Sequence, residues 1–303
     1  MSATVSVRVP ATVANLGPGF DAFSVALDMH LEIDLETRRD TIDIGIEGEG
    51  ADHLPTDETN LVIRSMNEFF DQVARRPAGY ALRVRNPIPL AAGLGSSAAA
   101  VVGGLAAARA LTGRNIPQAD MIQLATEIEG HPDNVLAAMV GGLVVCYRNA
   151  TGVLSHHRAE VSRRLIPVLA VPRDGFPTGE SRRVLPDQVS FSDAQHTAAR
   201  AGLLIGALMT GGGTDVLAEA MSDRLHEPHR LALMPETAAV HQELRAAGLA
   251  VALAGAGPSL LGIVPRVEVT MRTEQIRRVC RARNAGWRVF VSDWEPKGAQ
   301  TTP

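Results

Sequence analysis

The segment Pro89–Ala99 (PLAAGLGSSAA) combines residue types that suit the binding of a phosphate group. Glycines allow the backbone to approach a ligand closely, and the two serines precede an apolar stretch that predicts a helix from about residue 97 to 111. Amide groups and the helix dipole both favour an anion at a helix N-terminus. The segment matches neither the GxxxxGK[ST] phosphate loop nor the dinucleotide GxGxxG pattern. A tight turn followed by a helix N-cap would use the same residues, so the segment alone leaves both interpretations open.

Three further segments carry polar side chains beside glycines or prolines: Ala11–Asp21 (ATVANLGPGFD), Glu127–Asn134 (EIEGHPDN) and Leu253–Ser259 (LAGAGPS). The first could present amide and carboxylate groups to a ligand, although a structural turn is favoured when it is taken alone. The second places acids where a helix ends, and such acids near a phosphate would suit Mg²⁺. Solvated helix-end charges with an aspartate N-cap are the alternative. The third, by itself, favours a plain hairpin or bulge.

Composition narrows the chemistry that is open to this chain. Of the 29 basic residues only Lys297 is a lysine, which disfavours a lysine in the site and leaves anions to arginine, backbone amides or a metal. A net charge of −4 argues against a nucleic-acid partner. No apolar run is long enough to span a membrane. The two cysteines, Cys146 and Cys280, predict free thiols in a reduced, cytoplasmic protein.

With 303 residues, two packed domains are expected. Apolar periodicity predicts an α+β protein with a boundary in the polar stretch 149–164. The domains are then 1–155, which binds nucleotide, 156–295, and a flexible tail over 296–303. The predicted strands are 3–9, 41–47, 80–85, 142–147, 165–171, a pair around 255–257, and 287–291. The predicted helices are 61–73 with Thr59 or Asn60 as N-cap, 97–111, 117–129, 133–139, 192–209, shorter pieces to 247, and 273–284.

Taken together and in this order, the four motifs resemble the GHMP kinase superfamily (galactokinase, homoserine, mevalonate and phosphomevalonate kinases). The phosphate-loop pattern PxxxGLGSSAA is matched without a gap, and VPATVANLGPGFDAFSVALD, HPDN and LAGAGPS resemble the homoserine kinase versions of the other motifs. The resemblance covers residues 3–295. It implies a two-domain GHMP kinase fold, whose N-terminal domain has a left-handed βαβ crossover and whose C-terminal domain is a ferredoxin-like α/β sandwich.

The resemblance also implies the cofactors and the residues that bind them. ATP would be the phosphoryl donor, with Mg²⁺ held by Ser97 and Glu127, and Glu129 could substitute for Glu127. Asn134, Asp133 and Glu127 would be catalytic, with the amide of Asn134 facing the accepting hydroxyl. The residues implied for the nucleotide are Asn60, Pro89, Leu90, Ala91, Ala92, Gly93, Leu94, Gly95, Ser96, Ser97, Ala98 and Ala99.

The implied activity is phosphorylation of the side-chain hydroxyl of L-homoserine to O-phospho-L-homoserine, in threonine biosynthesis, by a protein that forms a homodimer. Another GHMP kinase, such as a mevalonate kinase, is the nearest alternative, but those tend to carry a catalytic lysine in the N-terminal segment and this chain has none there. A non-catalytic member that binds an effector is the other. The chain departs from the family pattern at Ser181 and Thr197, where alanine and asparagine are usual. The residues implied for homoserine are Asn15, Asp21, His131, Asp133, Asn134, Thr178, Arg182, Arg230 and Gly255.

Overall fold

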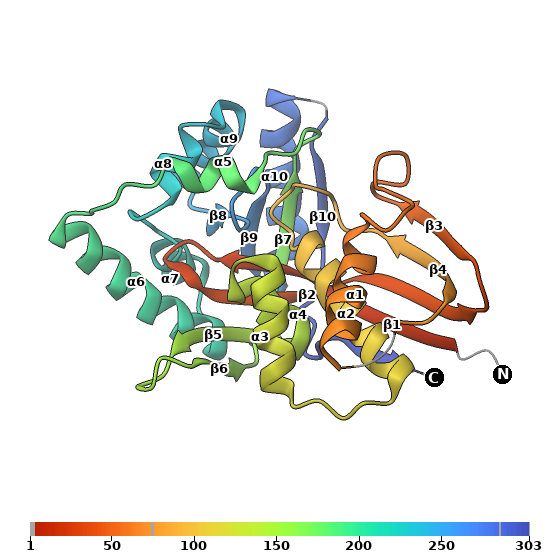
Figure 1. Ribbon diagram of the computed structural model, residues 1–303. Helices are drawn as coiled ribbons and strands as arrows, with labels where there is room; N and C mark the ends of the chain where they lie inside the picture. Colours follow the sequence, from red (N-terminus) through yellow and green to blue (C-terminus); the bar gives the residue numbers. More distant parts are fainter. Residues whose placement is uncertain (1–3, 74–75, 285, 303) are drawn as a thin grey trace.

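Two β-sheets with helices packed on them build the protein, and the computed structural model describes residues 4–73, 76–284 and 286–302 (Figure 1). Within these residues the first sheet has seven strands, in the order β11-β1-β2-β4-β3, and β5 pairs with both β2 and β6. Its neighbours are antiparallel except for the parallel pair β3 and β4. The strands are β1 (Thr4–Asn15), β2 (Gly19–Arg38), β3 (Ile42–Gly48), β4 (Gly79–Asn86), β5 (Leu143–Arg148), β6 (Leu154–Ala159) and β11 (Gln300–Thr302).

Four helices pack with the first sheet: α1 (Leu61–Val73), α2 (Ser96–Thr112), α3 (Gln118–Glu129) and α4 (Pro132–Val140). Helix α1 lies between the parallel strands β3 and β4, which gives the βαβ unit that the family resemblance implies, while the handedness of its crossover stays a prediction. Helix α2 is apolar because it is buried between neighbours. A Cβ at Gly104 would lie only 2.3 Å from the carbonyl oxygen of Val62 in α1, so this glycine permits the close packing that fixes α2 and its N-terminus.

The second sheet has four antiparallel strands in the order β10-β7-β9-β8. Together with helices α9 and α10 it encloses a separate apolar core, and this mixture confirms the α+β class. None of the helices in the described part of the chain is long and apolar enough to cross a membrane. The elements are β7 (Leu165–Val171), β8 (Val251–Leu253), β9 (Leu260–Pro265), β10 (Arg288–Val291), α5 (Thr178–Arg183), α6 (Phe191–Thr210), α7 (Thr214–Ala220), α8 (Glu227–Leu231), α9 (Pro235–Ala246), η1 (Arg266–Glu268) and α10 (Val269–Arg283).

Three strands were not predicted from the sequence, namely β2, β6 and, near the end of the chain, β11. The segment 11–21 was treated as a loop, but β1 continues to Asn15 and β2 starts at Gly19, so that only three residues connect two long paired strands. The polar stretch 149–164 was expected to separate the domains, yet it contains β6, which pairs with β5 in the first sheet. Its alternation is weak because β6 is an edge strand that buries none of its side chains fully.

The prediction of a flexible tail over 296–303 is wrong for the residues that the structure describes. Gln300–Thr302 forms β11, which pairs antiparallel with β1 and completes the first sheet. The amide of Ala299 donates to the carbonyl of Ala138 in α4 at 2.8 Å. The end of the chain therefore returns from the second domain and supports the helix that begins at the HPDN motif.

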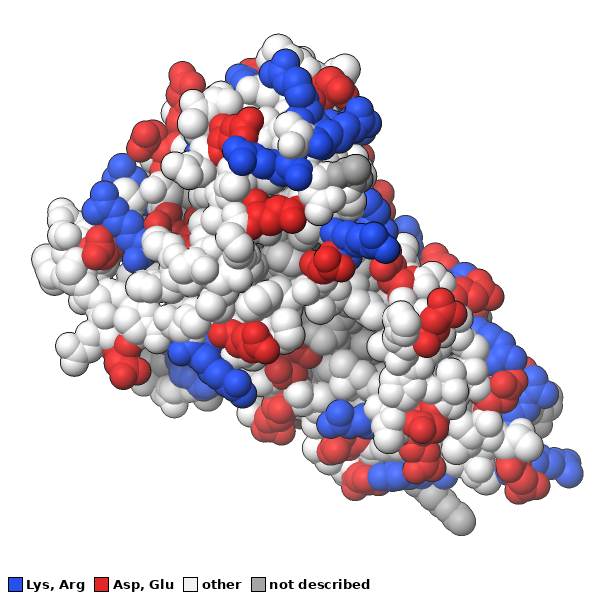
Figure 2. Space-filling view, turned by 90° about the horizontal axis from the view of Figure 1, so that it is seen from above, with Lys and Arg blue, Asp and Glu red and all other residues white. Residues whose placement is uncertain are grey.

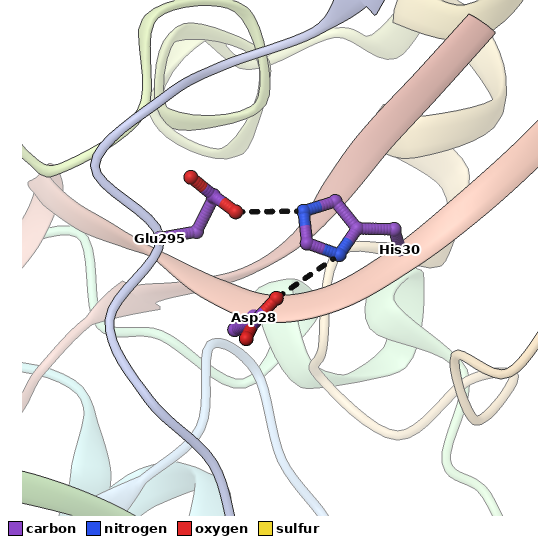
Figure 3. Close-up of side chains that lie close together, drawn as sticks. All are labelled: Asp28, His30 and Glu295. Carbon is purple, nitrogen blue, oxygen red and sulfur yellow. Dashed lines mark hydrogen bonds and ion pairs between the residues drawn. The ribbon is translucent and has the colours of Figure 1, made fainter.

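A buried histidine fastens this returning segment to the first sheet (Figure 3). His30 of β2 lies between two carboxylates: its Nε2 is 2.9 Å from Oε2 of Glu295, and its Nδ1 is 3.4 Å from Oδ1 of Asp28. Burial and the nearby Arg8 lower the pKa of His30. Arg8 lies 3.6 Å from Asp28 and already supplies the balancing positive charge. We therefore interpret the cluster as a structural contact that holds the segment around Glu295 against β2, rather than as a cation site.

Candidate active site

A cleft of about 790 Å³ lies beside the glycine-rich loop Pro89–Gly95. One wall comes from the first domain, and the other includes Gly179, Arg182 and Gly255 of the second. Figure 2 looks onto the molecule from above and shows a recess with largely uncharged residues between the two lobes. Three of the four motifs singled out in the sequence contribute lining residues, and the remaining one, at 11–21, packs directly behind them.

The two loop glycines are required by packing. Gly93 and Gly95 have φ of 75° and 70°, in the left-handed region that side chains rarely adopt. A Cβ at Gly93 would lie 1.9 Å from the carbonyl oxygen of Ala254, and one at Gly95 would lie 2.0 Å from Oγ1 of Thr12. The sequence suggested that these glycines allow close approach to a phosphate. The structure shows that they also allow the loop to pack tightly between the segments 11–21 and 253–259.

Helix α2 begins at Ser96, and its N-terminus lies at the cleft. Amides in the first turn of a helix have no intrahelical acceptor, and among the described residues none accepts a hydrogen bond from the amide of Gly93, Gly95 or Ser96. These groups are free to bind an anion. The residues of the loop from Pro89 to Ser97 all line the cleft.

The predicted nucleotide contacts of Ala98 and Ala99 need correction. Both side chains are completely buried in the core of the first domain and do not line the cleft. The amide of Ala99 donates to the carbonyl of Gly95 at 2.9 Å, so it belongs to the helix. The positions of Ala98 and Ala99 therefore do not support the predicted nucleotide contacts.

Glu129, and not Glu127, lies beside Ser97. The Ser97 hydroxyl donates to Oε1 of Glu129 at 2.5 Å, and both residues line the cleft. Glu127 is exposed and accepts a hydrogen bond from Gln123. Residues two apart on a helix point about 200° away from each other, so both glutamates cannot face α2. Burial raises the pKa of Glu129. The prediction that paired Glu127 with Ser97 is thus corrected.

The HPDN motif forms the start of α4, and some of its polar side chains face the cleft while Asp133 is buried in the protein. Asn134 lines the cleft, and its Oδ1 accepts a hydrogen bond from the Thr12 hydroxyl at 2.8 Å. Asp133 is buried and does not line the cleft, and its Oδ1 accepts a hydrogen bond from the amide of Asn134 at 2.7 Å. Nδ1 of His131 lies 3.3 Å from Oδ1 of Asp133, which raises the pKa of His131. Asn134 is therefore presented to a ligand more directly than Asp133.

Asp21 and Arg182 form a bidentate ion pair across the domains. The two guanidinium nitrogens donate to the two carboxylate oxygens at 2.9 and 2.8 Å. Asn15 supports Asp21, because its Oδ1 accepts from the Asp21 amide at 2.9 Å and its Nδ2 donates to the carbonyl of Gly255 at 2.8 Å. Four residues that the family resemblance placed around one substrate are thus connected by successive hydrogen bonds.

Arg230 lies deeper, with only 2% of its surface exposed. Its Nη1 donates to the carbonyl of Gly255 at 3.2 Å, and its Nε donates to the carbonyl of Ser181 at 3.3 Å. His226 was not predicted as a site residue, yet its Nδ1 is 3.2 Å from Arg230 and its Nε2 is 2.8 Å from the carbonyl of Gly17. Ser181, where the family usually has alanine, donates its hydroxyl to Ala256 at 3.1 Å.

Two predicted residues remain. Asn60 lines the cleft and is the N-cap of α1, as expected: its Oδ1 accepts from the Val62 amide at 3.0 Å, while its Nδ2 donates to Pro55 at 2.8 Å. Its polar atoms therefore hold the wall of the cleft. Thr178 begins α5, but its side chain lies outside what the structure describes.

Known proteins align with this chain over all the residues of the site. The chain matches the family model of the GHMP kinases N terminal domain over residues 60–142 and that of the GHMP kinases C terminal over residues 204–282. It is 42% identical over 265 residues to a homoserine kinase of Trichormus variabilis, covering 86% of each chain. With a homoserine kinase of Streptomyces avermitilis it is 37% identical over 305 residues, covering 100% of this chain and 97% of the relative. A crystal structure of a homoserine kinase from Cytophaga hutchinsonii superposes with a TM-score of 0.85 at 27% identity, over 99% of this chain and 97% of that one.

Proposed function

This chain belongs to the GHMP kinases and, within them, to the homoserine kinases, and we propose that ATP and L-homoserine meet in the cleft beside the glycine-rich loop. The enzyme transfers the γ-phosphoryl group of ATP to the side-chain hydroxyl of L-homoserine and releases ADP and O-phospho-L-homoserine. The observation that carries the assignment of the site is that a helix N-terminus with free amides and the Asp21–Arg182 pair belong to one group of residues around the cleft. One end suits a phosphate, and the other suits an amino acid.

The loop from Gly93 to Ser97 holds the phosphates in this proposal. Its free amides and the dipole of α2 supply fixed positive potential where negative charge is spread in phosphoryl transfer. No lysine is available for this purpose, because Lys297 lies in the segment that packs against α4. The wall around Asn60, which also contains Leu54 and Pro55, is apolar enough to take a nucleotide base.

Ser97 and Glu129 fit a magnesium ion. A hydroxyl and a carboxylate 2.5 Å apart, at the place proposed for phosphate, are the oxygen donors that Mg²⁺ takes together with phosphate oxygens and water. The ion would neutralise charge on the transferred group. Without a bound ion, Glu129 accepts the hydrogen bond of the Ser97 hydroxyl, so neither group lacks a partner.

Asp21 and Arg182 recognise the amino acid. Homoserine carries an ammonium and a carboxylate group, and each can replace one half of the existing ion pair. Arg182 presents a planar fork of donors that matches a carboxylate, and Asp21 matches an ammonium group. A substrate that lacks the amino group, such as mevalonate, would leave Asp21 without its partner at a half-buried position.

Asn134 positions the accepting hydroxyl. Its carboxamide is oriented by the Thr12 hydroxyl, which leaves the Nδ2 side free to face the cleft. A loose transition state needs little deprotonation of the nucleophile, so orientation by an amide suffices. Asp133 lies in the first turn of α4, does not line the cleft, and is engaged by the Asn134 amide and by His131, so the proposal gives it no role as general base.

Two wider assignments belong to this proposal. Both cysteines are free and buried, which supports the expected cytoplasmic location. The homodimer is proposed from the family resemblance alone. Light scattering of the purified protein measures the oligomeric state, and a monomer at all concentrations would contradict the dimer.

A substrate panel tests the function. ADP release is followed by a coupled assay with homoserine, mevalonate, galactose and shikimate at fixed ATP and Mg²⁺. We expect fast turnover with L-homoserine alone. Equal or better turnover with mevalonate would refute the assignment of the amino-acid end of the cleft, and binding of homoserine without any ADP release would indicate a non-catalytic member of the family.

A further inference from the structure

The aromatic ring of Phe20 contacts two guanidinium groups and one imidazole at the amino-acid end of the cleft. Its ring centroid lies 5.9 Å from the guanidinium carbon of Arg182 and 5.3 Å from that of Arg230. The imidazole of His226 stacks on the same ring, with centroids 5.1 Å apart and an interplanar angle of 26°. The face of an aromatic ring is negative, so it attracts cations within about 6 Å.

The backbone around Phe20 is held so that this contact can form. Consecutive side chains of a strand normally point to opposite faces, yet Phe20 and Asp21 both reach Arg182. The φ of 52° at Asp21 breaks the alternation. The loop is tied to the second domain by His226, whose Nε2 lies 2.8 Å from the carbonyl of Gly17. The backbone conformation at Asp21 and the hydrogen bond from His226 to Gly17 thus both hold the ring against the two arginines.

The two arginines need such a support because they carry the same charge. Arg182 is half-exposed and has Asp21 as its only ion-pair partner among the described residues, while Arg230 is buried and forms no salt bridge there. Burial and the neighbouring Arg182 lower the pKa of Arg230, while the carboxylates of Asp21, Asp133 and Asp223 act in the opposite direction. The ring supplies negative potential to both guanidinium groups without competing for a ligand, because it accepts no conventional hydrogen bond.

We propose that Phe20 is a positioning residue for substrate recognition, which holds the guanidinium group of Arg182 against the buried Arg230, in the orientation in which Arg182 binds the carboxylate of the amino acid. The inference rests on the proposed function of the cleft. According to this proposal, the ring of Phe20 increases the preference of the enzyme for alcohols that also carry a carboxylate group. Phe20 does not line the cleft itself, so it acts through the arginines.

A series of fluorinated phenylalanines at position 20, introduced site-specifically, tests this role with little change of shape. Fluorine withdraws electron density and weakens the negative face of the ring. We expect the KM for L-homoserine to rise stepwise, by roughly 5- to 30-fold at full fluorination, with kcat and the KM for ATP within about twofold of the wild type. The carboxylate-free analogue 3-amino-1-propanol should show an unchanged kcat/KM, so that the preference for homoserine falls by the same factor.

Two ordinary variants complete the test. Phe20→Tyr keeps the aromatic face and should retain the homoserine KM within about threefold, whereas Phe20→Met, which keeps only apolar bulk, should resemble the fully fluorinated protein. A homoserine KM that does not respond to fluorination overturns the proposal, and so does an equal loss for homoserine and the analogue, which would mean a purely structural role. Wild-type protein without turnover of homoserine would instead refute the proposed function, so the two failures are distinguishable.

Discussion

Glu129→Gln distinguishes the proposed magnesium site at Ser97 and Glu129 from the one with Glu127 that the family resemblance implied. The change removes the negative charge 2.5 Å from the Ser97 hydroxyl but keeps an oxygen that can accept its hydrogen bond. Glu127→Gln is the matched control, because Glu127 lies on the same helix, is exposed and contacts only Gln123 among the described residues. Both variants remove one charge from α3, so general effects on net charge cancel between them.

The size of the effect follows from the loss of a charged ligand. A hydrogen bond or metal contact to an ionised group contributes roughly 1.5–3 kcal/mol, which corresponds to a 10- to 150-fold higher Mg²⁺ requirement for Glu129→Gln. Burial raises the pKa of Glu129, so its proton competes with Mg²⁺ as the pH falls. The apparent Mg²⁺ affinity of the wild type should therefore decrease on acidification, and that of Glu129→Gln should not depend on this ionisation.

Initial rates of ADP release, measured against Mg²⁺ concentration at fixed ATP and saturating homoserine, provide the assay, and thermal unfolding checks that both variants are folded. The reasoning is refuted if Glu127→Gln raises the Mg²⁺ requirement while Glu129→Gln leaves it unchanged. A pH response of equal size in wild type and Glu129→Gln would also contradict it, because the titrating group would then lie elsewhere.

Three further predictions concern the cleft and its supports. Asn134→Ala should lower kcat by roughly 100-fold with a change in homoserine KM below about threefold, whereas Asp133→Asn should act mainly on that KM because Asp133 holds His131, which lines the cleft; steady-state kinetics that show the reverse split would make Asp133 the base. Gly95→Ala should lower the free energy of unfolding by about 1–3 kcal/mol because its Cβ would meet Thr12, and Thr12→Ala in the same protein should recover part of the loss in a denaturant titration. An unchanged unfolding midpoint would show that the loop adapts. Deletion of 296–303 should lower both the melting temperature and kcat, since β11 and the segment before it support α4; a fully active, equally stable deletion would make this segment dispensable.

Local patterns in the sequence predicted most elements of the fold correctly. Helix α1 was placed at its observed bounds and α2 to within one residue, because amphipathic spacing, an asparagine N-cap and a C-terminal glycine act within a few residues of one another. The glycine-rich loop stood out as a candidate anion site for the same reason, since glycines followed by a helix N-terminus define the backbone geometry locally, although the segment alone equally allowed a plain turn with an N-cap. The missed strand β6 carries no such local signal, because it lies at a sheet edge.

Contacts between distant segments were decided only by the tertiary structure. Asp21 and Arg182 are 161 residues apart, and the sequence could name both without showing that they pair. The choice of Glu129 over Glu127 depends on how α3 is rotated against α2, which the packing of both helices fixes. The final strand β11 is too short to be recognised alone and exists because β1 offers it a partner. In each case the deciding interaction joins groups that only the packed chain brings together, whereas the sequence specifies the groups themselves.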